Sequence, residues 1–181
     1  LGLKWHEIHE HFPHYGNYHP EGVTEWRSGH AREDATPISV DLIRKTIANL
    51  HAAGACAMPY IQVAGDVDEA LAEKFYDSLI RDWHGGTWSV WPGTLMMNSD
   101  PSLAFGRDLE RQVRGLVARY PEMDGVFLDQ AGYNFLDTAH DDGITAVNNR
   151  PGYMTGFAYF PHVERLSALL HPEKAIIANG P

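Results

Sequence analysis

Cysteine is almost missing from this chain, because only Cys56 is present among its 181 residues. A single thiol cannot form an internal disulfide, so an apolar core has to hold the fold together. Many exported proteins also lack disulfides, and this scarcity therefore leaves the localisation unknown. Hydrophobic residues make up 44% of the chain, which indicates a globular rather than a disordered protein.

Positive charge is also scarce. The chain has 14 Lys and Arg residues against 24 Asp and Glu residues, which gives a formal net charge of −10. Nucleic-acid phosphates and an anionic membrane surface would both repel such a chain. No apolar run approaches the roughly 20 residues of a membrane-spanning helix. We therefore expect neither a nucleic-acid partner nor a membrane partner.

Short apolar runs alternate with amphipathic stretches along the chain, which predicts alternating strands and helices. We expect four strands, at residues 3–8, 55–63, 125–128 and 175–178. Helices are expected at residues 39–53, at 68–82, from Asp100 onward and around 163–170. Ser39 suits the start of the first helix and Gly54 its end, while Asp100 and Pro101 suit the start of the third.

The predicted strands are joined by helices and should therefore run parallel. Neither G-x-G-x-x-G nor a P-loop lysine motif follows any strand, which disfavours a nucleotide-binding sheet, and we expect no cofactor. The pattern favours α/β architecture in which parallel (β/α) units form part of a TIM (β/α)₈ barrel, a fold of about 250 residues. Residues 1–181 are interpreted as a single incomplete barrel domain of roughly half that size, with the remainder of the barrel expected elsewhere.

Asp129 is the candidate for catalysis. It ends the apolar run Val126–Leu128, and a long polar loop follows it. In parallel α/β folds, reactive side chains lie at the carboxyl ends of strands. A carboxylate fixed there is held more rigidly than one on a mobile loop, which suits a nucleophile or an electrostatic stabiliser.

Long loops follow the predicted strand ends and carry aromatic, carboxylate, amide and imidazole side chains. Aromatic faces stack on sugar rings, and the polar groups can bind several hydroxyl groups, so the loops indicate a carbohydrate substrate. The expected substrate-binding residues are Trp5, Glu7 and His9 after the first strand, Gln130, Tyr133, Asn134, His140, Asp141, Asp142 and Arg150 after the third, and Asn179 after the fourth.

Three segments carry a family resemblance: Ala-Arg-Tyr-Pro at 118–121, Asp-Gly-Val-Phe-Leu-Asp-Gln at 124–130 and Ala-His-Asp-Asp-Gly at 139–143. With them, residues 101–181 resemble TIM-barrel glycoside hydrolases of the broad α-galactosidase and α-glucosidase type, and most of all their uncharacterised relatives. The resemblance implies a glycosidase or its catalytic fragment, with Asp129 as the nucleophile. It also implies that the general acid lies on a later strand.

Other interpretations stay open. A non-catalytic carbohydrate-binding barrel would keep the cleft without the acid. The His9-Glu10-His11 segment is similar to the metal pair of amidohydrolase barrels, but the usual further ligands are not evident, and we expect no metal. Asp129 could instead cap a turn or pair with Arg150. Asp141 and Asp142 could shape the turn before Gly143, and Trp5 could be a packing anchor.

Overall fold

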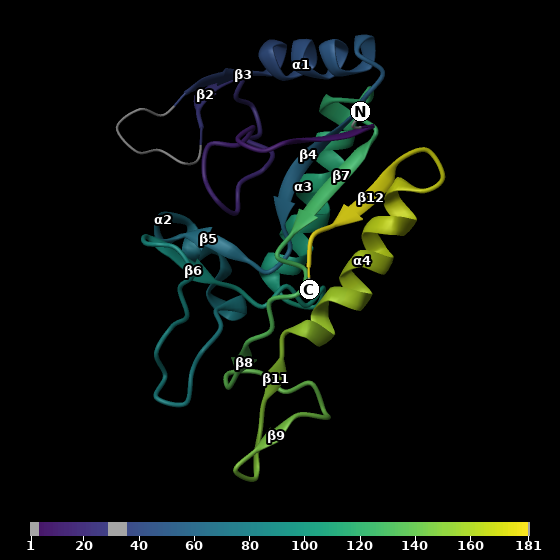
Figure 1. Ribbon diagram of the computed structural model, residues 1–181. Coiled ribbons are helices and arrows are strands. Elements are labelled where there is room, and N and C mark those ends of the chain that lie inside the picture. Colours follow the sequence, from purple (N-terminus) through teal and green to yellow (C-terminus); the bar gives the residue numbers. More distant parts are fainter. Residues whose placement is uncertain (1–3, 29–35, 181) are drawn as a thin grey trace.

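A parallel sheet of four strands forms the centre of the computed structural model, which describes residues 4–28 and 36–180 (Figure 1). The register pairs Gln62 with Asp129 and Leu128 with Ala178. The expected parallel order is confirmed, although Leu3, the expected start of the first strand, lies outside the described residues. The neighbouring strands are, in order, β1 (Trp5–Ile8), β4 (Cys56–Gln62), β7 (Gly125–Asp129) and β12 (Ala175–Ala178).

Three long helices accompany the sheet: α1 (Val40–Ala52), α3 (Ala104–Arg119) and α4 (Gly156–Leu170). Ser39 caps α1 as expected, because its Oγ accepts a hydrogen bond from the backbone N–H of Leu42 at 3.0 Å. In Figure 1, α3 lies behind β4 and β7, and α4 lies beside β12. No helix in the described part of the chain has the length and apolar character needed to cross a membrane.

The helix expected at residues 68–82 is wrong in its extent. The chain there forms the one-turn helix α2 (Glu69–Ala72) and the 3₁₀ helix η1 (Glu73–Ser78), with a break at Phe75. The residues around it instead form an antiparallel pair, β5 (Asp66–Asp68) with β6 (Thr94–Met96). Asp68, the expected first residue of the helix, is therefore part of a strand.

The third helix also begins later than expected, at Ala104. Asp100 does not cap it, because the Asp100 carboxylate accepts hydrogen bonds from Ser102 and from the hydroxyl of Tyr153 at 2.6 Å. Pro101 therefore lies in a turn that precedes α3. Apolar residues at helical spacing form the buried face of the helix: Phe105, Leu109, Val113 and Leu116, with Tyr120 just beyond its end.

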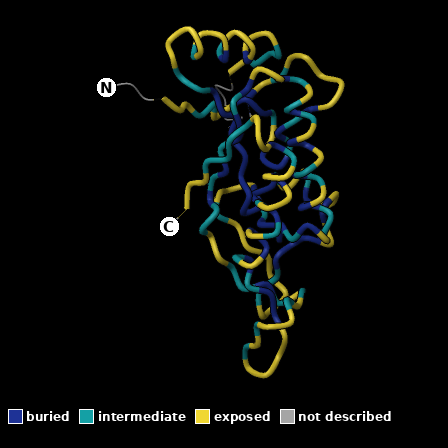
Figure 2. The backbone as a smooth tube through the Cα atoms, turned by 90° about the vertical axis from the view of Figure 1, so that its right-hand side faces the viewer, coloured by how far each residue is buried: buried dark blue, intermediate teal, exposed yellow. Residues whose placement is uncertain are grey.

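Short antiparallel strand pairs lie outside the four-stranded sheet. The sequence did not predict them, because strands of two or three residues are too short to show an alternation of apolar and polar residues. Besides β5 and β6, they are β2 (Glu25–Arg27) with β3 (Pro37–Ser39), β8 (Leu136–Asp137) with β11 (Tyr153–Met154), and β9 (Ala146–Val147) with β10 (Arg150–Pro151). The β9–β10 hairpin forms the exposed lower tip of the molecule in Figures 1 and 2.

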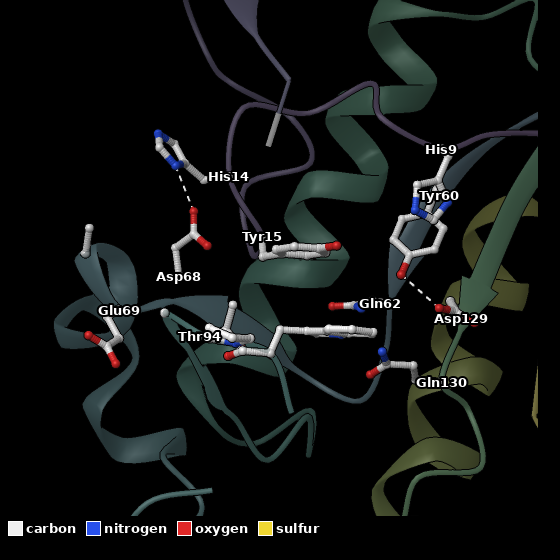
Figure 3. A pocket seen from close by; sticks show the side chains of 14 residues that line it. His9, His14, Tyr15, Tyr60, Gln62, Asp68, Glu69, Thr94, Asp129 and Gln130 are labelled. Carbon is white, nitrogen blue, oxygen red and sulfur yellow. Dashed lines mark hydrogen bonds and ion pairs between the residues drawn. The ribbon is translucent and has the colours of Figure 1, made fainter. Parts of the chain in front are cut away.

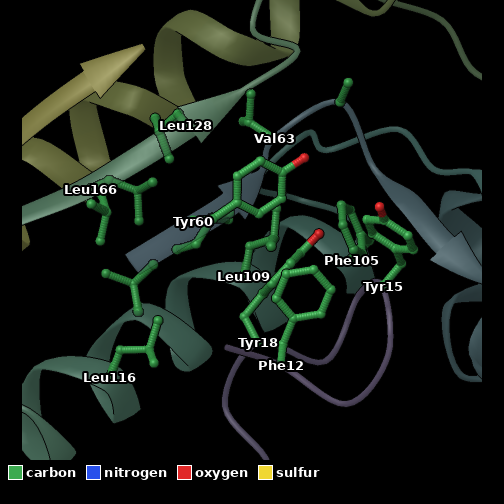
Figure 4. Packing of buried hydrophobic residues seen from close by; sticks show 14 of the residues in the cluster. Phe12, Tyr15, Tyr18, Tyr60, Val63, Phe105, Leu109, Leu116, Leu128 and Leu166 are labelled. Carbon is green, nitrogen blue, oxygen red and sulfur yellow. The ribbon is translucent and has the colours of Figure 1, made fainter. Parts of the chain in front are cut away.

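Aromatic side chains fill the core beside the sheet (Figure 4). The ring of Phe12 lies 5.0 Å from that of Tyr18 and 5.9 Å from that of Tyr60, centroid to centroid. All three residues are at most 2% exposed. Burial of each such side chain stabilises the fold by about 1.5–3 kcal/mol, so this cluster fixes the loop after β1 against the sheet.

Candidate functional site

Asp129 lies at the carboxyl end of β7, between the ends of β4 and β12. Its carboxylate is held from both sides. The hydroxyl of Tyr60 donates to Oδ2 at 2.9 Å (Figure 3). Nδ2 of Asn179 donates to Oδ1 at 2.8 Å. Burial raises the pKa of Tyr60 above its ordinary value, so the phenol keeps its proton and remains a donor. The two hydrogen bonds fix the orientation of the Asp129 carboxylate.

A cleft of about 660 Å³ opens beside Asp129. A second cavity of about 410 Å³ adjoins it and includes Tyr133 and Asn179. Trp91, Asp129 and Gln130 line both cavities, so the carboxylate lies at their junction. Both volumes fall within the range of ligand-binding pockets. Tyr15, Tyr60 and Trp91 supply aromatic walls to the larger cavity.

The side-chain oxygens of two glutamines beside Asp129 lack hydrogen-bond partners. Gln62 is 1% exposed and Gln130 is 7% exposed, and Oε1 of each is buried without a donor. Both residues line the larger cleft (Figure 3). A buried acceptor without a donor costs about 1–3 kcal/mol, so these oxygens suit a ligand that brings hydroxyl or amine donors.

The backbone of Gln130 is strained. Its φ is +58°, a left-handed conformation that a glutamine rarely adopts. The turn is held on both sides, because the N–H of Tyr133 donates to the Gln130 carbonyl at 3.1 Å and that of Ala131 donates to the Asn179 carbonyl at 3.0 Å. Strain of this kind concentrates at functional sites, where the surroundings enforce it.

The opposite wall of the cleft is acidic. Asp68 and Glu69 lie there, across the cleft from Asp129 in Figure 3, and Nδ1 of His14 is 2.8 Å from Oδ2 of Asp68. Behind them, Asp66 is fully buried and accepts a hydrogen bond from Thr94 at 2.5 Å. Burial, helped by the charge of Asp68, raises the pKa of Asp66 to about 6, although the hydrogen bond from Thr94 acts in the opposite direction.

The loop after β1 brings His9, His14 and Tyr15 to the cleft because α3 anchors it. The amide of Gln112 accepts from the N–H of Tyr18 at 2.5 Å and donates to the carbonyl of Gly16 at 2.9 Å. Gly16 has a φ of +83°, and a Cβ there would lie 2.9 Å from a methyl carbon of Val67. Glycine is therefore required where the loop crosses β5.

Several residues expected at the site do come together. His9, Asp129 and Gln130 line the larger cavity, and Tyr133 and Asn179 line the smaller one. Glu7 lies in β1, and its carboxylate is hydrogen-bonded to Nδ1 of His9. The ring centroid of His9 lies 4.2 Å from that of Tyr60, which donates to Asp129. Glu7 therefore contacts the cleft indirectly, through His9.

Other expected residues lie outside these cavities. Trp5 is the first residue of β1 and lies at its amino end, away from Asp129. Asn134 accepts a hydrogen bond from the N–H of Gly156 at 2.9 Å and so fixes the start of α4. Arg150 is exposed in β10, and the carboxylate of Asp129 bonds Tyr60 and Asn179 as described above.

His140 belongs to a buried clamp. Its Nδ1 lies 2.6 Å from Oδ2 of Asp137, and its Nε2 lies 2.7 Å from the carbonyl of Asp77. Asp137 is fully buried and also accepts from the backbone N–H of Ala139 and the side chain of Asn98. The hydrogen bond to Asp137 raises the pKa of His140, which favours an imidazolium that donates from both nitrogens.

Asp141 and Asp142 shape the turn before Gly143. Asp141 accepts from the N–H of Gly143 at 2.7 Å, whereas Asp142 accepts from the backbone and hydroxyl of Thr145 and from the N–H of Met154. Partial burial opposes ionisation of Asp142, but the hydrogen bond from the Thr145 hydroxyl and those from backbone N–H groups prevail and lower its pKa to about 2. Both carboxylates therefore stabilise the turns of their own loop.

The two histidines of the His9-Glu10-His11 segment, for which no metal was expected, lie in different surroundings. His9 lines the cleft, whereas His11 is 2% exposed and its Nε2 lies 2.9 Å from the carbonyl of Tyr60. Burial lowers the pKa of His11 to about 4, so it is a neutral core residue. Within residues 4–28 and 36–180, no group of three or more His, Cys, Asp or Glu side chains has metal-binding geometry.

Tyr60 is one of the cleft residues that the sequence analysis missed. It lies inside β4, where the run Cys56–Gln62 indicates only a buried strand. One signal was present: side chains two apart in a strand share a face, so Tyr60 shares its face with Gln62 at the strand end. Asp68 and Glu69 were missed because the long helix expected there would have placed them on an outer layer.

Comparison with known proteins gives a fold and no sequence family. No family model matches the chain, and no curated protein sequence matches it. A cycloisomaltooligosaccharide glucanotransferase from Paenibacillus sp., solved with cycloisomaltoheptaose, is similar over 98% of this chain and 26% of its own, with a TM-score of 0.65 and 17% identity. An α-N-acetylgalactosaminidase from Bifidobacterium bifidum is similar over 98% of this chain and 27% of its own, with a TM-score of 0.61 and 15% identity.

An α-L-fucosidase from Paenibacillus thiaminolyticus is also similar, over 93% of this chain and 26% of its own, with a TM-score of 0.54 and 19% identity. The chain thus spans about a quarter of the length of these three solved chains. At such identities the likeness concerns the fold, which is a mixed α/β fold of the kind found in carbohydrate-active enzymes.

Proposed function

We propose that this chain carries the carbohydrate-binding cleft and the nucleophile of a glycoside hydrolase, with Asp129 as the nucleophile and the sheet as part of a TIM barrel. One observation carries the proposal. Asp129 is a strand-end carboxylate that Tyr60 and Asn179 orient, beside two buried amide oxygens that lack donors. The similar solved structures support it, because three of them are enzymes whose names specify sugars.

The cleft suits a sugar ring for three physical reasons. Tyr15 and Trp91 offer faces on which the axial C–H groups of a sugar can pack. Gln62 and Gln130 offer acceptors for hydroxyl groups. The carboxylate of Asp129 lies at the junction of the two cavities, where the bond between two sugar units would lie.

In the proposed reaction, a carboxylate oxygen of Asp129 attacks the anomeric carbon, and the bond from that carbon to the leaving oxygen breaks. A carboxylic acid across the cleft protonates the leaving oxygen, and Asp68 and Glu69 lie on that wall. Water then attacks the anomeric carbon, gives a proton to the carboxylate that had protonated the leaving oxygen, and breaks the bond to Asp129, which restores both carboxyl groups. Donation from Tyr60 and Asn179 keeps the carboxylate of Asp129 aligned before the attack.

The test uses Asp129→Asn and Asp129→Gly, with Asp41→Asn on the exposed first turn of α1 as the matched control. Turnover is measured on a panel of aryl glycosides, and binding of the matching sugars is measured by calorimetry. Asp129→Asn should abolish turnover while sugar binding is retained, because the lost charge acts mainly on the transition state. Asp41→Asn should behave like the wild type.

Azide sharpens the assignment. In Asp129→Gly, azide can enter the space of the lost carboxylate and attack the anomeric carbon of an activated aryl glycoside. A glycosyl azide of inverted configuration would support Asp129 as the nucleophile. Full turnover in Asp129→Asn would refute that role. Sugar binding without turnover in the wild-type chain would favour a non-catalytic carbohydrate-binding domain.

A further inference from the structure

Exposed aromatic rings continue outward from the cleft. Trp91 lines both cavities, and Tyr133 lines the smaller one. The ring of Tyr133 packs edge-on against Phe135 at 6.2 Å, and Phe135 contacts Trp88 at 5.6 Å, centroid to centroid. Trp88 and Tyr133 are each 40% exposed and Trp91 is 47% exposed, so these rings keep much of their surface available.

The segment that carries the tryptophans is an ordered hairpin. Arg81 forms an isolated antiparallel bridge with Thr87, and the N–H of Met96 donates to the carbonyl of Trp88 at 2.9 Å. The carbonyl of Trp91 accepts from the backbone and hydroxyl of Thr94, at 3.1 and 2.9 Å. The two rings are therefore presented by a fixed backbone.

The tyrosine side of the surface is also anchored. The hydroxyl of Tyr159 in α4 donates to the carbonyl of Tyr133. The N–H of Phe135 donates to the hydroxyl of Thr155 at 2.9 Å, and the N–H of Thr155 returns a bond to the Phe135 carbonyl at 3.0 Å. A surface that is already ordered loses little conformational entropy when a ligand binds.

We propose that Trp91, Tyr133, Phe135 and Trp88 form an aromatic track that binds the further sugar units of an oligosaccharide or polysaccharide chain. The ligand class of the cleft is then a sugar chain rather than a simple glycoside. This inference rests on the proposed function, because the track begins at the two cavities that flank Asp129. Its continuity with those cavities distinguishes it from isolated exposed aromatics, which are common on protein surfaces.

A sugar chain fits this surface better than a charged partner does. The four rings of the track bear no charge, and the cleft from which it extends carries the carboxylates Asp68, Glu69 and Asp129. Each ring offers a flat face to the C–H groups of a sugar while the sugar hydroxyls remain in water. Rigid aromatics also give large contact areas at low entropic cost, which is why they dominate many binding surfaces.

The experiment compares ligands of increasing length. Neutral oligosaccharides of two to eight units, from the sugar series that binds best, are titrated into the wild-type chain, Trp88→Ala, Trp88→Phe and Phe160→Ala. Phe160 is 76% exposed on α4, outside both cavities, and serves as the matched control. Trp88→Phe retains a ring and separates loss of the platform from damage to the hairpin.

In the wild type, affinity should rise with ligand length. Trp88→Ala should weaken binding of the longest ligand by roughly tenfold, the scale of one aromatic anchor, and leave the disaccharide unaffected. Trp88→Phe should retain most of the gain, and Phe160→Ala all of it. This pattern would establish the track.

Two results would overturn it. Equal affinity of the wild type for short and long ligands would refute the track while leaving the carbohydrate cleft intact, and absence of binding to every sugar would remove both proposals. Sedimentation at several protein concentrations provides the second measurement. Self-association that Trp88→Ala abolishes would assign the surface to a second copy of the chain instead.

Discussion

Asp129 at the end of β7 and the carboxylates of the loop that follows β7 have different surroundings. Asp129 receives two side-chain hydrogen bonds and borders a cleft with buried amide oxygens that lack donors. Asp137, eight residues further along by its number, is fully buried and accepts hydrogen bonds from four groups, two backbone N–H groups and two side chains. Asp142 likewise accepts from backbone and hydroxyl groups of its own loop.

This difference distinguishes carboxylates that stabilise the fold from those that can contribute to ligand binding. A carboxylate whose acceptor sites are filled by its own chain stabilises a loop and leaves nothing for a ligand. A site that keeps unpaired buried acceptors costs stability in the free protein, and a ligand with suitable donors recovers that free energy. By this criterion we propose that the Asp129 region binds a ligand, whereas the carboxylates of the 136–155 loop stabilise that loop.

The largest expected effect is on activity. Asp129→Asn should lower turnover on glycosides by roughly 10³-fold or more, the scale on which loss of a charged catalytic group acts. Its free energy of unfolding, measured by urea denaturation, should change by no more than about 1 kcal/mol, because the amide can still accept from Tyr60. A large loss of stability with unchanged turnover would place Asp129 among the structural carboxylates.

Asp137→Asn should lower the stability rather than act on turnover directly, and it is the largest change in stability that we expect. The new amide would face two donors, Nδ1 of His140 and Nδ2 of Asn98, in a fully buried place. We expect a loss of about 3 kcal/mol in the free energy of unfolding, typical of a broken buried ion pair. A midpoint of urea unfolding close to that of Asp41→Asn would contradict the clamp.

The sequence predicted the scaffold better than the site, for physical reasons. Short apolar runs indicate buried segments, and such runs located all four strands of the sheet. Pro59 lies within β4 and pairs with Ile8, although a proline removes one hydrogen-bond donor from a strand. Asp129 was found because a polar residue that ends an apolar run marks a strand end.

The remainder of the site depends on contacts between distant segments, which no local pattern records. Tyr60 and Asn179 meet Asp129 across 69 and 50 residues of sequence, respectively. Asp142 and His140 are of the same residue types as those expected at a site. Only their hydrogen-bond partners show that they stabilise a loop. Residue type predicted the kind of chemistry, whereas hydrogen-bond partners distinguish the residues at the cleft from those of the loop.

The clamp should also give stability a dependence on pH. The pKa of His140 is raised from its usual 6.5, so its contribution is complete below pH 6.5 and is lost as pH rises through the raised value. Although burial opposes ionisation, hydrogen bonds led by that from His140 lower the pKa of Asp137 from its usual 3.8. The Asp137 contribution is therefore present above pH 3.8 and lost as pH falls through the lowered value.

Comparison of the wild type with His140→Asn isolates this term. The wild type should exceed the variant in free energy of unfolding by the largest margin between about pH 4 and pH 6.5, and the margin should shrink at alkaline pH. Urea unfolding at intervals from pH 4 to pH 9 measures it. A margin that is constant over this range would show that the imidazole acts through packing alone.

The smallest expected effect lies in the cleft and runs against the usual direction of mutations. Gln130 has a φ of +58° and an unpartnered side-chain oxygen, so Gln130→Gly removes backbone strain and one unsatisfied buried group. Strain of this kind costs about 1–3 kcal/mol, while glycine adds about 0.5–1 kcal/mol of unfolded-state entropy and forfeits some packing. We expect a net gain of about 0.5–1 kcal/mol, which corresponds to a rise in Tm of about 1–4 °C for a chain of this size.

Sugar binding should weaken in the same variant, because the acceptor at the junction of the two cavities is lost. A variant that is less stable and binds sugar as the wild type does would show that Gln130 is a structural residue, and the strain at the end of β7 would then need another explanation.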